Sequence, residues 1–224
     1  YAIHCGLVGS EMCIRASIIA EPLEVMKITN SRQETDERVR DIAAKCRLNI
    51  EHLRRFPHAF SGGQRQRISI ARALVSNPKF IVADESVAAL DVSIQADILN
   101  LLKQLQTELN LTYLFISHDL SVVAHVCDIV AVMYLGHIVE MGPSRELFKN
   151  PKHSYTKALL SSIPSIDPEK RSEAIELKGE IPSALNPPPG CVFRTRCPNP
   201  GIDCKGGEIT MGLTEVEPLS LIHI

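Results

Sequence analysis

Two acidic residues and a histidine follow short apolar runs in this chain, and these three residues are the best suited to chemistry. Asp84 and Glu85 come directly after the run at residues 80–83, and His118 comes shortly after the run at residues 113–116. Carboxylates at the end of a buried strand can hold Mg²⁺ and orient water, and an imidazole can hydrogen-bond a phosphate oxygen. Hydrolysis of a terminal phosphate requires groups of these kinds. For each residue alone, the alternatives are an ordinary strand-to-loop junction and a structural histidine.

A serine, two glycines and a glutamine form a second candidate segment at Ser61, Gly62, Gly63 and Gln64. Ser61 is a suitable N-cap for a helix that we predict over residues 61–76. The first amides of a helix can bind an anion, and glycines let a phosphate approach the backbone. The alternative is an ordinary capped helix after a Gly-Gly turn.

Strands and helices alternate along the middle of the chain, which predicts an α/β layered fold. We expect strands at residues 79–83, 112–117, 128–134 and 137–140, and helices at 34–47, 61–76, 121–126, 145–149 and 153–161. A long amphipathic helix should begin at Ser93 as its cap, and a helix break is expected at residues 56–58. The first strand, at residues 79–83, lacks polar alternation, as parallel strands do when both faces are covered. Such strands place Asp84, Glu85 and His118 at a sheet edge, where α/β folds bind ligands.

Four motifs in this order resemble the second half of an ABC-type ATPase. They are SGGQ at residues 61–64, the apolar run ending at Asp84 and Glu85, the triplet ending at Asp91, and the segment around His118. The resemblance implies an α/β fold that forms the C-terminal half of a P-loop (ABC-type) nucleotide-binding domain with a helical subdomain. A loop-rich C-terminal extension would follow it, and ATP and Mg²⁺ would be the cofactors.

The resemblance also implies a role for each of these residues. Asp84 would bind Mg²⁺, Glu85 would polarise the attacking water and His118 would contact the phosphate, which makes the last two catalytic. Asp91 would couple two sites across a dimer, although a simple N-terminal helix charge explains it equally well. The segment that would contact the ATP bound by an opposing subunit consists of Ser61, Gly62, Gly63 and Gln64.

Four longer stretches resemble the ATP-binding subunits of bacterial oligopeptide and dipeptide importers: residues 60–74, 90–99, 150–160 and 179–197. This resemblance implies ATP hydrolysis that energises the import of short peptides at the cytoplasmic face of the bacterial inner membrane. The implied partners are a second ATP-binding subunit in a homo- or heterodimer, transmembrane permease subunits and, indirectly, a solute-binding protein. Two alternatives stay open: an ABC ATPase for nickel or glutathione, and a catalytically degenerate subunit that only lends its signature motif to a neighbour.

Several positions depart from the pattern of the resembled family. No glycine is followed by lysine, so the Walker A motif is missing, and we find no Q-loop. Ser86 stands where the family usually has proline, and Ala88 and Ala89 stand where the D-loop usually opens with serine. Neither change removes a charged or metal-binding group. Without the phosphate loop and its lysine, we expect this chain alone to bind ATP poorly and to hydrolyse little or none.

Three cysteines near the end of the chain form another candidate site. Cys191, Cys197 and Cys204 have no zinc-knuckle spacing, but iron–sulfur clusters accept irregular spacings when four thiolates converge. The alternative is a set of reduced or structural cysteines in a proline-rich loop.

Composition sets broad limits on function and on domain organisation. The formal charge of −2 argues against nucleic acid as a partner, and 224 residues with 45% apolar residues suffice for one domain and an extension. With no signal peptide or membrane-spanning stretch, and seven cysteines, we expect a soluble intracellular protein.

The chain is expected to divide into four segments. Residues 1–16 and 219–224 resemble translated sequencing-adaptor DNA and would be non-native. Residues 17–142 would form a partial ATPase domain with a helical subdomain at 17–76 and a catalytic core at 77–142, and residues 143–218 would form the extension.

Overall fold

Helices and strands alternate along the chain, so the predicted α/β class is confirmed. The computed structural model describes residues 17–49, 51, 60–163, 174–201, 204, 213–217 and 220–223. It divides into two compact units, of which one ends at Asp119 and the other begins at Leu120. The helix break expected at residues 56–58 and the segment 1–16 lie outside the described residues. No helix in the described part of the chain is long and apolar enough to span a bilayer.

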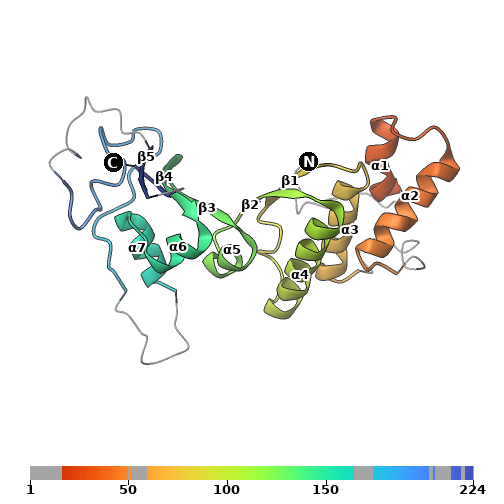
Figure 1. The fold of residues 1–224 in the computed structure, drawn as a ribbon, viewed down its shortest axis with the longest axis horizontal. Helices are drawn as coiled ribbons and strands as arrows, with labels where there is room; N and C mark the ends of the chain where they lie inside the picture. The colour runs from red at the N-terminus through yellow and green to blue at the C-terminus, as the bar shows by residue number, and fades with distance from the viewer. Residues whose placement is uncertain are drawn as a thin grey trace. The chain divides into compact units, whose positions relative to one another are not determined.

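Three helices open the first unit: α1 (Ser17–Val25), α2 (Arg32–Lys45) and α3 (Gly62–Leu74), which lie together in Figure 1. Ser31 caps α2 because its hydroxyl accepts a hydrogen bond from the Glu34 amide. Arg72 of α3 forms a 2.6 Å ion pair with Glu21 of α1. Apolar side chains from all three helices are buried between them, as the three- and four-residue spacing predicts. These core residues include Ile19, Leu23, Val39, Ile42, Ile68 and Ala71.

A two-stranded parallel sheet completes the first unit. Strand β1 (Phe80–Asp84) pairs with β2 (Thr112–Ile116), and α4 (Val92–Leu109) connects them. The predicted apolar stripe of α4 is buried at Ile98, Leu101, Leu102 and Leu105. The Tyr113 hydroxyl of β2 donates to the Leu102 carbonyl of α4 at 3.3 Å, which fixes the helix against the sheet.

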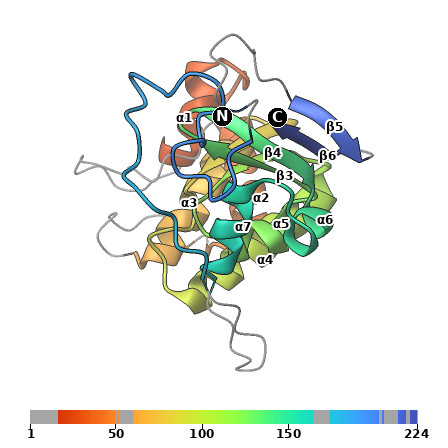
Figure 2. The same ribbon diagram turned by 90° about the vertical axis from the view of Figure 1, so that its left-hand side faces the viewer.

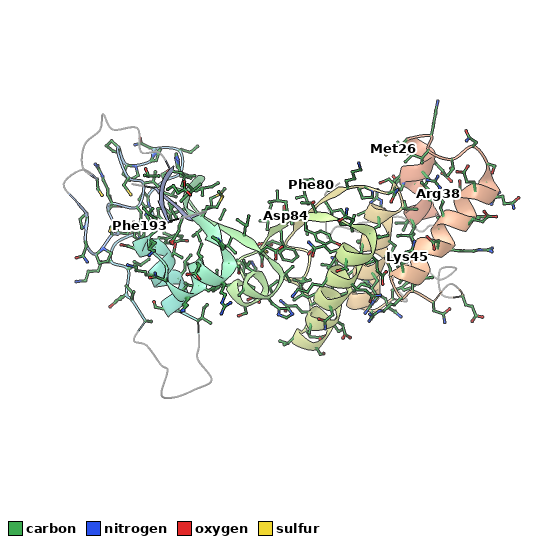
Figure 3. All side chains as sticks on the ribbon, in the orientation of Figure 1. Met26, Arg38, Lys45, Phe80, Asp84 and Phe193 are labelled. Atoms are coloured by element: carbon green, nitrogen blue, oxygen red, sulfur yellow. The ribbon has the colours of Figure 1, made fainter. Side chains whose placement is uncertain are left out.

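The prediction that both faces of β1 are covered is wrong for the described structure, and β2 is open on one face as well. Ile81 and Ala83 are buried, but Phe80 and Leu114 are 49% exposed and Ile116 is 45% exposed. Side chains alternate between the two faces of a strand, and in the described part of this unit the helices cover only one of them. Figure 3 shows Phe80 on the side of β1 that faces away from α3 and α4.

The second unit is built on an antiparallel sheet with the strand order β3-β4-β6-β5 (Figure 2). Its elements are α5 (Leu120–Val126), β3 (Ile129–Tyr134), β4 (His137–Pro143), α6 (Ser144–Lys149), α7 (Ser154–Ser161), β5 (Leu213–Glu217) and β6 (Ser220–His223). The hairpin between β3 and β4 turns at Leu135 and Gly136, which both have positive φ, as a tight hairpin turn requires. The sequence analysis did not predict β5 or β6.

A bulge in β4 buries a carboxylate. Val132 pairs with Glu140 and Met133 with Ile138, so Val139 is an extra residue, and Val139 and Glu140 are both buried. The two carboxylate oxygens of Glu140 accept hydrogen bonds from the Lys152 amide at 2.7 Å and the His153 amide at 3.0 Å. The start of α7 is therefore tied to the sheet.

Phe193 forms the centre of the core of the second unit (Figure 3). It is completely buried, and its ring centroid lies 5.2 Å from that of Tyr134, 5.4 Å from that of Tyr155 and 5.5 Å from that of His153. Aromatic pairs at such distances stabilise a core beyond the area that they bury. The segment around Phe193 thus shares one core with β3 and α7.

We expect Phe193→Ala to lower the free energy of unfolding by about 3–5 kcal/mol, because the truncation leaves a cavity in this core. Leu185→Ala is the matched control, since Leu185 is 98% exposed in the same extension and should change little. The free energy of unfolding of both variants is measured by denaturant titration, with the near-ultraviolet circular dichroism of the tyrosines as the signal. Equal losses in the two variants would contradict the packing described.

Candidate functional site

Asp84 and Glu85 lie where β1 ends beside β2. Asp84 is the last residue of β1 and pairs with Ile116, and the Glu85 amide donates to the Ile116 carbonyl at 2.9 Å. Glu85 has φ 45°, which is uncommon for a residue other than glycine. This left-handed residue turns the chain out of the strand directly after Asp84, so the acidic pair sits at a sharp bend.

His118 lies beside Glu85 although 33 residues separate them. Its Nδ1 is 3.1 Å from Glu85 Oε1, and because a carboxylate only accepts, this contact requires a proton on Nδ1 that donates. The side chains of His118 and Glu85 are 73% and 60% exposed, so both are accessible to a ligand. Parallel pairing of β1 and β2 therefore brings together the acidic pair and the histidine that the sequence singled out; their catalytic roles stay predictions.

Ser61 begins α3 as its N-cap, as predicted. Its hydroxyl oxygen accepts from the Gln64 amide at 3.4 Å, and its own amide donates to Gln64 Oε1 at 3.2 Å. This reciprocal pair is a capping box, which the pattern Ser-x-x-Gln can reveal in sequence. Because the Ser61 oxygen acts as an acceptor in the cap, its proton is left to donate to an incoming anion.

The two glycines pack against the start of α4. A Cβ atom on Gly63 would lie 2.6 Å from Ile94 Cγ2, and one on Gly62 would lie 3.4 Å from Leu90 Cδ2. The first distance leaves no room for a side chain, whereas the second is close to ordinary contact. Gly63 is therefore needed for close helix packing, apart from any role toward a phosphate.

Asp91, and not Ser93, caps α4, so the predicted cap is wrong. Asp91 Oδ1 accepts from the Ile94 amide at 3.0 Å and from the Ser93 hydroxyl at 2.8 Å. These two hydrogen bonds, chiefly that from Ile94, hold the pKa of the Asp91 carboxyl below its ordinary value. The helix begins earlier than predicted because the turn after Glu85 ends at Leu90. The alternative interpretation of Asp91 as an N-terminal helix charge thus has a structural basis.

Ser86, which stands where the resembled family usually has proline, is buried. Ser86 is 1% exposed, and its hydroxyl has no hydrogen-bond partner among the described residues. Backbone hydrogen bonds from the Ala88 amide to the Glu85 carbonyl and from the Leu90 amide to the Val87 carbonyl hold the turn around it. The turn therefore forms without the proline and serine that the resembled family usually has.

The donor set at the strand ends fits a magnesium ion. Mg²⁺ prefers oxygen ligands, keeps several waters and needs only one or two carboxylates when phosphates supply further ligands. Asp84 is partly exposed at the bend and offers one such carboxylate beside Glu85. The described residues contain no group of three or more histidine, cysteine or acidic side chains arranged to hold a metal without such help.

The proposed iron–sulfur ligands gain no support from this structure. Cys191, Cys197 and Cys204 are free thiols around the core of the second unit, and Cys191 is buried in it. Burial is the main cause that raises the pKa of the Cys191 thiol, which disfavours the thiolate that a cluster needs. The geometry agrees with the alternative of reduced structural cysteines.

Two residues near the site were missed by the sequence analysis. Gln95 Nε2 donates to Asp119 Oδ2 at 3.4 Å, which links the first turn of α4 to the residue after His118. Ile94 fills the space beside Gly63. The two contacts join residues far apart in the chain, so no local pattern reveals them.

Two family profiles match the chain. The profile described as ABC transporter matches residues 5–88, and the profile described as oligopeptide/dipeptide transporter, C-terminal region, matches residues 139–204. The second match agrees with the extension that the sequence analysis identified.

Curated relatives share more than half of the matched residues. The oligopeptide transport ATP-binding protein OppF of Escherichia coli is 55% identical over 189 residues, which cover 84% of this chain and 57% of OppF. The dipeptide transport ATP-binding protein DppF of Escherichia coli is 54% identical over 180 residues, covering 80% of this chain and 54% of DppF. AppF of Bacillus subtilis, an oligopeptide transport ATP-binding protein, is 55% identical over 193 residues, covering 84% of this chain and 58% of AppF. The chain thus spans between 54% and 58% of the length of these relatives.

Solved structures share the fold. CbiO1 of Clostridium perfringens, part of the ABC transporter complex CbiONQ, superposes with a TM-score of 0.54 at 29% identity over 63% of this chain and 55% of its own. The ATP-binding cassette MJ0796, solved as a dimer in a post-hydrolysis state with ADP and Pi, gives a TM-score of 0.52 at 27% identity over 64% of this chain and 62% of its own.

We expect Gly63→Ala to lower the free energy of unfolding by about 1–3 kcal/mol, the usual cost of overpacking, because the new methyl group collides with Ile94. In an Ile94→Ala background the same change should cost little. Gly62→Ala is the control, since its methyl group meets only the flexible end of Leu90. Thermal unfolding of the four variants measures these changes in stability. An equal loss of stability from Gly63→Ala in both backgrounds would exclude the collision.

Asp91→Ala should lower the melting temperature, whereas Asp91→Ser should largely retain it because serine is also a good N-cap. The folded pKa of Asp91 is lowered, so its stabilisation is present above the ordinary carboxyl pKa of about 4 and is lost as the pH falls through the folded value. Melting temperatures between neutral and strongly acidic pH measure this. Asp97→Ala, an exposed position of the same helix, is the control, and equal acid sensitivity of wild type and Asp91→Ala would contradict the cap.

Proposed function

The chain belongs to the ABC transporter family of ATP-binding proteins, and from this premise we propose that it energises the import of short peptides by ATP hydrolysis. The observation that carries the proposal is the contact between Glu85 and His118 beside Asp84, at the ends of two parallel strands. The match of residues 139–204 to the oligopeptide/dipeptide C-terminal region favours peptides as the transported substrate.

In the proposed site, Asp84 would hold Mg²⁺, usually through water. The ion supplies charge neutralisation for the phosphates of ATP when it is bound. Glu85 accepts a hydrogen bond from the attacking water and orients it, and His118 hydrogen-bonds a phosphate oxygen. The pairing of β1 with β2 keeps the side chains of His118 and Glu85 3.1 Å apart at the same edge of the sheet, which pre-organises them.

In this proposal, the start of α3 binds a second nucleotide, which the opposing subunit holds. The hydroxyl of Ser61 and the first amides of α3, at Gly62 and Gly63, contact ATP bound by the opposing subunit, and Gln64 holds Ser61 in its cap. Asp91 caps the first turn of α4, whose Ile94 lies against Gly63, and in this proposal it couples the two sites. Two ATP-binding subunits, identical or different, therefore work as a dimer.

The relatives' names support a role for this chain within a larger assembly. OppF and DppF are named as ATP-binding proteins of oligopeptide and dipeptide transport. We infer that this chain likewise acts at the cytoplasmic face of a bacterial inner membrane, bound to transmembrane permease subunits and indirectly dependent on a solute-binding protein. An iron–sulfur cluster is no part of this proposal.

A hybrid subunit tests the function. The region of Escherichia coli OppF that this chain matches is replaced by the corresponding residues of this chain, in cells that lack OppF. We expect oligopeptide uptake to return, and Glu85→Gln to lower ATP turnover of the purified transporter by about a hundredfold or more, as for loss of a general base. The chain alone should hydrolyse ATP only at background.

Glu108→Gln provides the control, because it makes the same chemical change at an exposed position near the end of α4. A hybrid that assembles and hydrolyses ATP without oligopeptide uptake would contradict peptide import and favour another substrate, such as nickel or glutathione. Turnover that is insensitive to Glu85→Gln would indicate a degenerate subunit that only lends its signature segment.

A further inference from the structure

We propose that Gln95 is a positioning residue for His118, which it holds through Asp119; this inference rests on the proposed function. The Nε2 of Gln95 donates to Asp119 Oδ2 at 3.4 Å, and Asp119 directly follows His118. Gln95 is half-buried in the first full turn of α4, and its amide donates to the Asp91 carbonyl at 2.8 Å. Its backbone is therefore fixed, and its side chain reaches out to the histidine loop.

The loop that carries His118 needs such an anchor. The His118 side chain is 73% exposed, so little packing holds it. Within the described part of the chain, its one side-chain hydrogen bond is with Glu85, which is itself 60% exposed. Within the loop, the Asp119 amide donates to the Ser117 hydroxyl at 3.0 Å. Asp119 thus makes two hydrogen bonds that hold the loop. Its amide bonds to Ser117 within the loop, and its carboxylate bonds to Gln95 of α4. A displacement of about 1 Å at a catalytic group can lower a rate about a hundredfold, so this tie bears on turnover.

The same turn of α4 also contacts the glycine segment. Ile94, the residue before Gln95, lies against Gly63 so closely that no Cβ fits between them. Asp91 caps this turn with two hydrogen bonds. The first turn of α4 is therefore one rigid body that touches the start of α3 on one side and the His118 loop on the other.

A charge swap tests the inference. Gln95→Glu places a carboxylate against Asp119, and we expect turnover of the hybrid transporter to fall about tenfold with the KM for ATP within about twofold, the size expected for one hydrogen bond to a charged group. Combining Gln95→Glu with Asp119→Asn restores a donor and an acceptor with their places exchanged. The double variant should recover most of the lost turnover, which a general defect in folding would not allow.

Hydrogen exchange gives a readout that does not depend on catalysis. In the 224-residue chain, Gln95→Glu should speed exchange of the amides at residues 117–119, and the double variant should slow it again. Gln33→Glu is the matched control, because the Gln33 amide also donates to a carboxylate, Glu37 Oε1 at 3.1 Å, on the exposed face of α2. This control should alter neither turnover nor exchange at residues 117–119.

The outcomes separate the inference from the function on which it rests. If the hybrid transports nothing but exchange at residues 117–119 follows the swap, the proposed function fails and the tie between Gln95 and the loop stands. If the hybrid transports peptides and Gln95→Glu changes neither turnover nor exchange, the inference is overturned. Loss of turnover that the double variant does not recover overturns it as well.

Discussion

The parallel pairing of β1 with β2 is the constraint on which the site depends. The register sets Asp84 opposite Ile116, so each strand ends at the same level and the residues that follow must emerge at one edge. The amide of Glu85 extends this pairing by one hydrogen bond, and its left-handed backbone then turns the chain away. A slip of the register by one residue would turn Asp84 to the opposite face and separate Glu85 from His118. The contact between these two side chains is therefore a consequence of backbone pairing and not of their own attraction, which is weak at such exposed positions.

Much of this arrangement follows from local sequence. The apolar runs, the serine before two glycines and the stripe of α4 each specify their element, because strand burial, N-capping and helical periodicity act within a few residues. The cap of α4 shows the limit of such reasoning. Asp91 and Ser93 are both good N-caps, and the choice depends on where the turn from Glu85 to Leu90 ends. The burial of Glu140 was also beyond local reasoning, since it depends on a bulge and on two amides more than ten residues away. The open face of β1 and β2 likewise reflects what packs on the sheet and not the composition of the strands.

The second unit shows why the extension is more than a proline-rich tail. Phe193 lies among Tyr134 of β3, Tyr155 of α7 and His153, so residues on both sides of Pro143 bury one another's apolar surface. Glu140 adds a polar tie, because a buried carboxylate is tolerated only when its oxygens are paired, and the amides of Lys152 and His153 provide those partners. Both interactions act across the junction between sheet and extension. These interactions join β3 and β4 to the segment that follows them, and both belong to one compact unit of the structure.

The departures at Ser86 and Ala88-Ala89 test how much of the turn after Glu85 relies on particular side chains. A proline at position 86 would restrict the conformation of the residue before it, which here is Glu85 with its positive φ. Serine lacks that restriction, but it adds a buried hydroxyl without a partner among the described residues, which weakens the bend. Opposing this cost, backbone hydrogen bonds to the carbonyls of Ile116, Glu85 and Val87 hold the turn at three successive points. Because backbone groups make these bonds, serine at residue 86 and alanine at residues 88 and 89 leave them in place. The conformation of Glu85 is thus set by the neighbouring strand and by the turn itself. The contact with His118 does not determine it.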